Sequence, residues 1–191
     1  MRDVVGILLA AGTARRFGKH KLLHPLPDDV PVGISAARTL IRAVPDAVAV
    51  VRPGDAALIE AFSAIGLKIV ENPHADEGMG TSLAAGVSAM PGAGGWLIAL
   101  ADMPWVRPAT MRSLAVRLRS GASIVAPVYA GRRGHPVGFA RRWGEQLQTL
   151  CGDEGARGLI ADHADELELL TTVDPGVLQD IDHPGDLAGD R

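Results

Sequence analysis

VVGILLA, residues 4–10, decides the fold because it is apolar on both of its alternating faces. A strand with one face in water alternates apolar and polar residues, whereas a strand covered by helices on both faces is apolar throughout. The segment therefore predicts a buried strand of a parallel sheet that ends at Ala11-Gly12. Similar short apolar runs predict further strands at residues 47–52, 67–71, 96–101, 123–128 and 137–140.

Segments with the apolar spacing of amphipathic helices lie between these strands. They cover residues 33–44, 55–65, 81–90, 109–119 and 156–164. This alternation predicts an α/β protein, a three-layer α/β/α sandwich around a mostly parallel sheet. At 191 residues the chain fits one domain, residues 1–191. Ligands of such sheets bind outside the carboxyl ends of the strands, so a site is expected in the loops there.

Composition excludes several classes of protein. With 47% hydrophobic residues and a net charge of -3, the chain is typical of a globular protein without a general affinity for nucleic acid. Its longest apolar runs are far shorter than the roughly 20 residues that cross a bilayer. We therefore expect no nucleic-acid or membrane partner. Residues 1–3 show no cleavable signal pattern and Cys151 has no second cysteine to pair with, so we expect the cytoplasm.

The loop after the first strand combines small residues with cations. It reads LAAGTARRFGKHK over residues 9–21. Small residues let backbone N–H groups approach an anion, and Arg16 and Lys21 supply the charge that a triphosphate requires. We assign both to phosphate binding; a strand end followed by a solvated basic turn is the alternative. The spacing fits neither a Walker A loop nor the dinucleotide-binding glycine fingerprint.

One carboxylate, Asp102, follows the apolar run at residues 96–101. It is expected at the carboxyl edge of the sheet, where an aspartate is a natural Mg²⁺ ligand. Mg²⁺ takes one or two protein carboxylates together with phosphate oxygens, so Asp102 needs a second anionic partner. The alternative is an ordinary aspartate that caps the turn after the strand.

The first loop resembles the phosphate-binding signature L-A-A-G-x-x-x-R-x-G-x-x-K of the MobA-like NTP transferase family. The matching residues are Leu9, Ala10, Ala11, Gly12, Arg16, Gly18 and Lys21. The resemblance implies a Rossmann-like nucleotidyltransferase fold that binds a nucleoside triphosphate in this loop. It also implies catalytic roles for Arg16, Lys21 and Asp102, with Mg²⁺ as the cofactor.

A segment near the C-terminus resembles the same family. Residues 180–187, DIDHPGDL, follow its D-I/V-D/N-x-P-x-D-L stretch, which implies that Asp182 is the second metal ligand. A helix cap before Pro184 is the alternative for this aspartate.

Residues 72–83 resemble the N-P-x-x-x-x-G-M-x-x-S-L segment that lines the base and ribose pocket in the family. The nucleoside contacts that this implies are Asn72, Met79, Gly80 and Ser82. Thr81 or Ser82 also suits the cap of the following helix, and both interpretations can hold together.

A cationic turn, GRRGHPVGF at residues 131–139, suits a phosphorylated acceptor. Solvated arginines on a hairpin are the alternative. This turn and GDEGAR at residues 152–157 resemble the subgroup that makes dinucleotide forms of molybdenum cofactor, in particular molybdopterin cytidylyltransferases. The resemblance implies that Arg133 and His135 bind the phosphorylated pterin. Residues 21–33 depart from the family's K-x-L-x-x-x-x-G-x-P-L pattern.

The function that follows is Mg²⁺-dependent transfer of CMP from CTP to molybdopterin, with release of pyrophosphate. CTP is favoured over GTP by the likeness of residues 10–12 and 78–80 to the cytidylyl members. Two alternatives stay open: a guanylyl- or other nucleotidyltransferase with a different phosphorylated acceptor, and a non-catalytic chaperone that passes the cofactor to a molybdenum enzyme.

Overall fold

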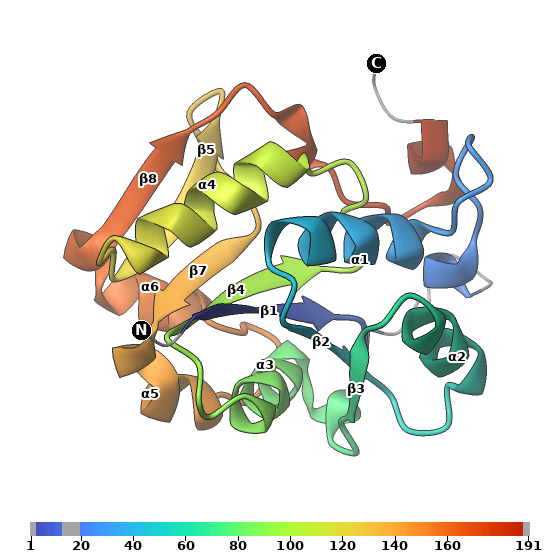
Figure 1. The fold of residues 1–191 in the computed structure, drawn as a ribbon, viewed down its shortest axis with the longest axis horizontal. Helices are drawn as coiled ribbons and strands as arrows, with labels where there is room; N and C mark the ends of the chain where they lie inside the picture. The colour runs from blue at the N-terminus through green and yellow to red at the C-terminus, as the bar shows by residue number, and fades with distance from the viewer. Residues whose placement is uncertain (1–2, 13–19, 189–191) are drawn as a thin grey trace.

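The computed structural model describes residues 3–12 and 20–188 (Figure 1). Arg16 and Gly18 of the expected phosphate loop lie outside the described residues. The strands are β1 (Val4–Leu9), β2 (Ala47–Val51), β3 (Lys68–Glu71), β4 (Gly95–Leu100), β5 (Ile124–Tyr129), β6 (Arg132–Arg133), β7 (Val137–Ala140) and β8 (Leu167–Thr171). The α-helices are α1 (Val32–Ala43), α2 (Ala56–Ala64), α3 (Met79–Ala89), α4 (Pro108–Arg119), α5 (Gly144–Gln148) and α6 (Arg157–Asp162).

Short 3-10 helices complete the described chain. They are η1 (Lys21–Leu23), η2 (Ala75–Glu77), η3 (Arg141–Trp143), η4 (Ala164–Glu166), η5 (Pro175–Leu178) and η6 (Pro184–Ala188). Within the same residues, no helix is long and apolar enough to cross a bilayer.

The described strands form one sheet in the order β3-β2-β1-β4-β7-β5-β6, with β8 paired to β5. β1 is parallel to β2 and β4, β2 to β3, and β5 to β8. β7 runs antiparallel to both of its neighbours, so the sheet is mixed and mostly parallel. The predicted α/β class is confirmed.

Helices cover both faces of the sheet: α1, α2 and α4 lie on one side, and α3 and α5 on the other (Figure 1). All six residues of β1 are buried. Leu8 packs into the apolar layer beneath α1 and α4, whereas Ile7 packs into the layer beneath α3 and α5. Burial on both faces explains why residues 4–10 carry no polar side chain.

Two strands, β6 and β8, were not among the predicted ones. β8 was not predicted, because its sequence LELLT neither alternates strictly nor is apolar throughout. It is a half-exposed edge strand whose Glu168 pairs with Arg117 of α4.

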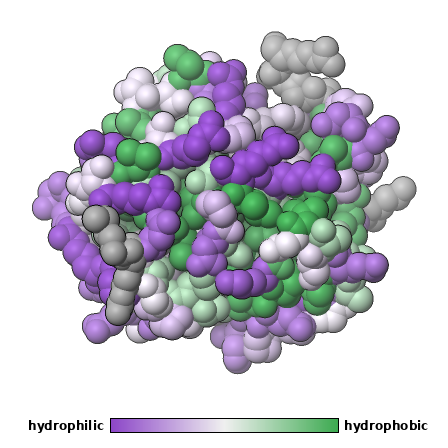
Figure 2. Space-filling model, in the orientation of Figure 1, coloured by the Kyte–Doolittle hydropathy of each residue, from purple (hydrophilic) through white to green (hydrophobic). Residues whose placement is uncertain are grey.

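At the opposite edge, Figure 2 shows hydrophobic side chains near β3, where Ile69 and Val70 are only partly buried.

The topology places a site at the ends of β1 and β4. From β1 the chain builds β2 and β3 on one side, and then returns through α3 to β4 on the other side. Strand order reverses there, which opens a crevice at the carboxyl ends of the two strands. Ala101 N donates to Leu9 O at 3.0 Å, so both strands end at the same level.

Candidate active site

A cavity of about 960 Å³ opens at this edge of the sheet. Its wall brings together distant segments of the described chain, among them the end of β1, η1, the residues after β2, the start of α3, the residues after β4 and the C-terminal segment. Predicted site residues in the wall are Leu9, Ala10, Ala11, Gly12, Lys21, Met79, Ser82, Asp102 and Asp182. Residues that are 173 positions apart in sequence, from Leu9 to Asp182, therefore line one space.

Lys21 and two of the predicted acidic residues are in contact. Lys21 Nζ donates to Asp102 Oδ2 at 2.8 Å and lies 3.6 Å from Asp182 Oδ1. The lysine side chain is only 13% exposed. Leu22, the next residue, is buried under α1 and anchors η1, so that Lys21 faces the cavity.

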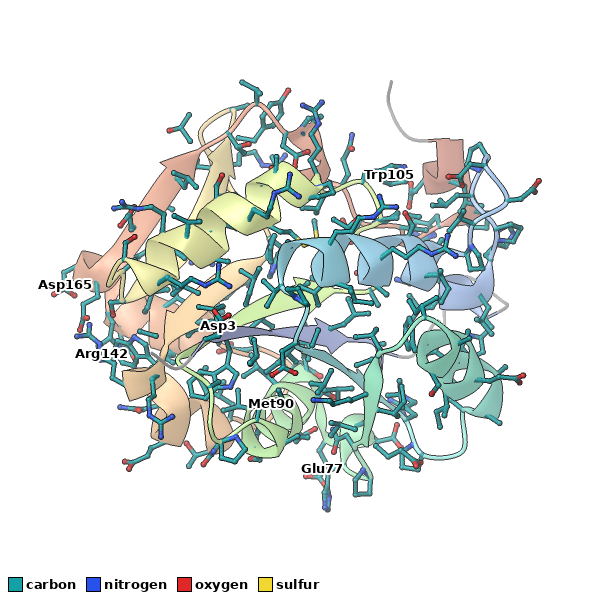
Figure 3. All side chains as sticks on the ribbon, viewed as in Figure 1. Asp3, Glu77, Met90, Trp105, Arg142 and Asp165 are labelled. Atoms are coloured by element: carbon teal, nitrogen blue, oxygen red, sulfur yellow. The ribbon has the colours of Figure 1, made fainter. Side chains whose placement is uncertain are left out.

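The C-terminal segment reaches the site because it is fixed at several points. Ile181 is fully buried, and its N–H donates to Asp102 O at 2.9 Å. Asp174, which is 1% exposed, accepts from Arg107 N and Thr110 Oγ1 at the start of α4. The segment crosses the loop that carries Trp105, labelled in Figure 3. These contacts set the position of the two aspartates that flank Ile181.

Asp180 is a third carboxylate that the sequence interpretation missed. Carboxylate oxygens of Asp102, Asp180 and Asp182, here called the carboxylate cluster, all lie within 4.8 Å of one another. Partial burial raises the pKa of Asp180, and the charges of Asp182 and Asp102 raise it further. The sequence does contain a sign of Asp180: in D-I-D at residues 180–182, an extended backbone that buries Ile181 turns Asp180 and Asp182 to the same side.

The carboxylate cluster suits a divalent cation. Hard carboxylate oxygens are the ligands that Mg²⁺ and Mn²⁺ prefer. Lys21 offsets only one of three negative charges, so the cluster keeps a net attraction for a second cation. The donor set therefore fits the predicted Mg²⁺.

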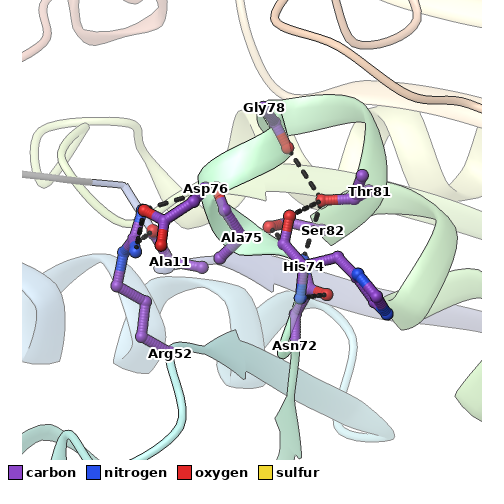
Figure 4. Close-up of polar contacts among 9 residues, drawn as sticks. All are labelled: Ala11, Arg52, Asn72, His74, Ala75, Asp76, Gly78, Thr81 and Ser82. Carbon is purple, nitrogen blue, oxygen red and sulfur yellow. Dashed lines mark hydrogen bonds and ion pairs between the residues drawn. The ribbon is translucent and has the colours of Figure 1, made fainter.

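The start of α3 differs from the expectation. The helix begins at Met79, two residues before the predicted start, and neither Thr81 nor Ser82 caps it; Gly78 is the N-cap residue. Asn72 Nδ2 instead donates to Thr81 Oγ1 at 2.9 Å and to Ser82 Oγ at 3.0 Å (Figure 4). The capping interpretation was wrong because the helix begins earlier.

Asn72 and Gly80 were predicted to contact the nucleoside, but the cavity wall does not include them. Asn72 is 2% exposed and holds the Ser82 hydroxyl in place. Gly80 is buried beneath the loop at residues 151–152: its N–H donates to Gly152 O at 2.8 Å. A Cβ on Gly80 would lie 2.6 Å from Cys151 O. Asn72 and Gly80 therefore support residues of the cavity wall without lining the cavity themselves.

The predicted acceptor residues also lie outside this wall. Arg133 is exposed on the β5-β6 hairpin, opposite Val128. His135 follows on the way to β7, and its N–H donates to Val177 O at 2.9 Å. Burial lowers the pKa of His135, and Arg133 lowers it further, while the nearby Asp102 acts in the opposite direction. His135 Nδ1 is buried and has no partner among the described residues.

Several wall residues were not anticipated. His20 Nε2 lies 2.8 Å from Asp55 Oδ2, and Asp55 caps α2 by accepting from Leu58 N. Arg52, Asp76 and Asp153 complete this side of the cavity. The sequence signal for Asp55 was its place directly before a helix, whereas Arg52 and Asp153 carry no local signal.

A lysine beside three carboxylates, in a cavity where β1 and β4 of a mostly parallel sheet end, is the architecture of a nucleotidyltransferase. The chain belongs to the MobA-like NTP transferase family, because the model of the MobA-like NTP transferase domain matches residues 6–167.

Two curated relatives are similar over nearly the whole chain. The purine catabolism protein PucB of Bacillus subtilis is 29% identical, covering 95% of this chain and 92% of its own length. Nicotine blue oxidoreductase of Paenarthrobacter nicotinovorans is 30% identical, with 94% and 92% coverage. The names of these relatives refer to different chemistry, so family membership does not define the substrate.

The fold is also similar to a solved structure. Rv0371c from Mycobacterium tuberculosis has a TM-score of 0.84 and 27% identity, covering 97% of this chain and 95% of its own. A second crystal structure of that protein is described as a complex with manganese and has a TM-score of 0.78 and 28% identity, with coverage of 96% and 95%. A divalent cation thus occurs in a relative of this chain.

Proposed function

We propose that the protein acts as a single domain, residues 1–191, that transfers CMP from CTP to molybdopterin in the presence of Mg²⁺ and releases pyrophosphate. The observation that carries this proposal is the contact of Lys21 with Asp102 and Asp182 inside the cavity. Family membership supports nucleotidyl transfer. The turn at residues 131–139 and the segment at residues 152–157 support the choice of acceptor.

The reaction is an in-line displacement at the α-phosphorus of CTP. A phosphate oxygen of the acceptor forms a new bond to this phosphorus, and the bond to the bridging oxygen of the leaving pyrophosphate breaks. A terminal phosphate is already ionised near pH 7, so no strong general base is needed. Catalysis then depends on positioning and on neutralising charge.

Lys21 binds the phosphate oxygens of CTP and balances the charge of the departing pyrophosphate. Arg16, which lies outside the described residues, is proposed to do the same. Asp102 and Asp182, together with Asp180, would hold Mg²⁺. The bound ion would supply positive charge at the phosphate oxygens of both substrates.

The remaining wall residues divide between the two ends of CTP. Ala10, Ala11 and Gly12 leave room for phosphate beside the backbone. Met79 and Ser82 contact the nucleoside, and Asn72 directs Ser82 by donating to its hydroxyl oxygen. The acceptor approaches from the side of the carboxylate cluster, where Arg133 and His135 contact its phosphate.

The test is pyrophosphate release from CTP, GTP or ATP with Mg²⁺ and molybdopterin. We expect release with CTP and pterin together, and little with either alone. Pyrophosphate release with GTP instead of CTP would identify the protein as a guanylyltransferase. Nucleotide binding without pyrophosphate release from any of the three would replace it with a cofactor chaperone that serves a molybdenum enzyme. A sugar phosphate offered in place of molybdopterin tests the alternative acceptors.

A further inference from the structure

Arg52 lies directly after β2 and lines the cavity, yet the proposed transfer assigns it no role. Its guanidinium donates in three directions (Figure 4). Nε donates to Ala11 O at 2.7 Å, Nη1 to Asp76 Oδ1 at 2.6 Å and Nη2 to Ala75 O at 3.4 Å. One side chain therefore connects the loop after β1 with the loop before α3.

Ala11 marks the point where the sheet stops supporting the first loop. Ala10 N still donates to Val50 O at 2.9 Å, as part of the β1-β2 ladder. For the described residues beyond Ala10, the bond from Arg52 Nε is the next contact that holds the backbone. A Cβ built on Gly12 would meet no atom of the described residues within 4 Å.

Holding the Ala11 carbonyl also sets the direction of an amide. The peptide between Ala11 and Gly12 is planar and trans, so its C=O and N–H point in opposite directions. When Arg52 holds the carbonyl on one side, the N–H of Gly12 points to the other. That N–H belongs to the loop that is proposed to receive the triphosphate.

The other two bonds reach the opposite side of the cavity. Ala75 and Asp76 belong to η2, which leads through Gly78 into α3. Gly78 has a φ of +112° and lines the cavity together with Met79 and Ser82. The position of η2 therefore decides how far the nucleoside side of the wall lies from the phosphate side.

We propose that Arg52 is a positioning residue for nucleotide binding: its guanidinium holds the phosphate loop and the nucleoside loop at one fixed spacing. This inference rests on the proposed function, and it concerns contacts with the two loops rather than with reacting atoms. Arginine suits the role because its planar fork directs several N–H groups at once, whereas a lysine has one ammonium on a flexible stem.

The hydrogen bond to the Ala11 carbonyl carries most of the effect, and the charge of Asp76 adds little to it. The Asp76 side chain is 78% exposed, and an exposed ion pair contributes little. Ala11 O, by contrast, receives a charge-assisted hydrogen bond of 2.7 Å at the cavity wall. Loss of the arginine fork should therefore weaken nucleotide binding more than loss of the Asp76 charge does.

The experiment compares four variants by calorimetric titration with CTP and excess Mg²⁺, without acceptor. Arg52→Lys keeps the charge and loses the fork, Arg52→Gln loses both, and Asp76→Asn loses only the ion pair. Arg117→Lys is the matched control, because Arg117 makes a two-pronged contact with Glu168 outside the cavity wall. The kcat and the KM for CTP are measured alongside, together with each thermal midpoint.

We expect Arg52→Lys and Arg52→Gln to weaken CTP binding about tenfold, which corresponds to the loss of one charge-assisted hydrogen bond. The KM for CTP rises by the same factor and kcat stays within about twofold, because lost ground-state binding is also lost in the transition state. Arg117→Lys binds CTP as the unmodified protein does, and Asp76→Asn, which keeps an acceptor oxygen for Arg52, loses less than about threefold. A purely structural role would lower the thermal midpoint without this selective rise in KM.

Wild-type CTP affinity in Arg52→Lys would overturn the inference, because charge alone would then suffice. An equal loss in Asp76→Asn would overturn it as well, since the ion pair would be responsible. A fall in kcat at unchanged KM would show contact with the reacting atoms instead. If Arg52→Gln unfolds, the comparison of Arg52→Lys with Arg117→Lys decides the question. If the unmodified protein binds no CTP, the proposed function itself fails. If it binds CTP and Arg52→Lys binds equally well, only the role of Arg52 fails.

Discussion

Lys21 Nζ and Asp102 Oδ2 lie 2.8 Å apart, although 81 residues separate them in the chain. They meet because η1, which the buried Leu22 anchors beneath α1, lies beside the residues that follow β4. Asp182 joins them from the C-terminal segment, with its Oδ1 3.6 Å from the same ammonium. Lys21 therefore holds carboxylates that a divalent ion would also bind, and its ammonium is close enough to serve the phosphates bound to that ion.

Replacement of Asp102 should abolish turnover and leave the fold intact. Asp102→Ala removes a charge from the edge of the sheet, where the side chain is 26% exposed, and not from the apolar core. We expect pyrophosphate release to fall about a thousandfold, equivalent to several kcal/mol of lost charge stabilisation. Circular dichroism and the thermal midpoint check the fold. Asp46→Ala, which loses an exposed contact with Lys68, is the control; near-normal turnover in Asp102→Ala would refute the metal assignment.

Loss of the lysine should affect both binding and rate. In Lys21→Met we expect CTP affinity and kcat each to fall about tenfold, because the ammonium neutralises phosphate charge in the ground state and more strongly in the transition state. Steady-state kinetics with CTP measure both. This pattern differs from the KM effect expected for Arg52. The control is Lys68→Met, which removes an exposed lysine and should have wild-type kinetics. Wild-type kinetics in Lys21→Met would show that Lys21 is only a solvated loop residue.

Sequence reasoning succeeded where a residue's environment is set locally. Residues 4–10 revealed a strand buried on both faces, because an apolar run between polar segments is visible in the chain itself. Lys21 and Asp102 were expected here because they lie in the loops after predicted strands, and Asp182 because residues 180–187 resemble the family's C-terminal stretch. The structure brings the three together. Their chemical roles stay predictions.

The residues that were missed depend on pairing between distant segments. Arg52 reaches Ala11 because Leu9 lies opposite Val50 in the β1-β2 register. An arginine at a strand end carries no local sign of that contact. Gly80 suggested room for a ligand, whereas the structure fills that room with the backbone of residues 151–152. The antiparallel direction of β7, a four-residue strand, was likewise not readable from its own sequence.

Asp180 offers a test of the carboxylate cluster that does not require turnover. Burial raises the pKa of Asp180, and the charges of Asp182 and Asp102 raise it further, so the three carboxylates repel one another. Asp180→Asn should therefore raise the thermal midpoint in EDTA by about 2–4 °C, as expected for about 1 kcal/mol in a chain of this size. The same variant should weaken Mn²⁺ binding, measured by titration calorimetry. Asp46→Asn is the control. An unchanged midpoint together with unchanged Mn²⁺ affinity would exclude Asp180 from the cluster.

Gly80 tests how the wall is supported behind the nucleoside. In Gly80→Ala the new Cβ would lie 2.6 Å from Cys151 O, closer than the two atoms can approach, so α3 and the loop at residues 151–152 must move apart. We expect a loss of about 1–3 kcal/mol in the free energy of unfolding, measured in urea, as for other overpacked sites. Gly92→Ala is the matched control, because a Cβ there meets no atom within 4 Å. Since the shift opens the wall beside Met79, CTP affinity should fall in Gly80→Ala and not in Gly92→Ala. Equal stability of the two variants would mean that the loop does not pack on α3 in solution.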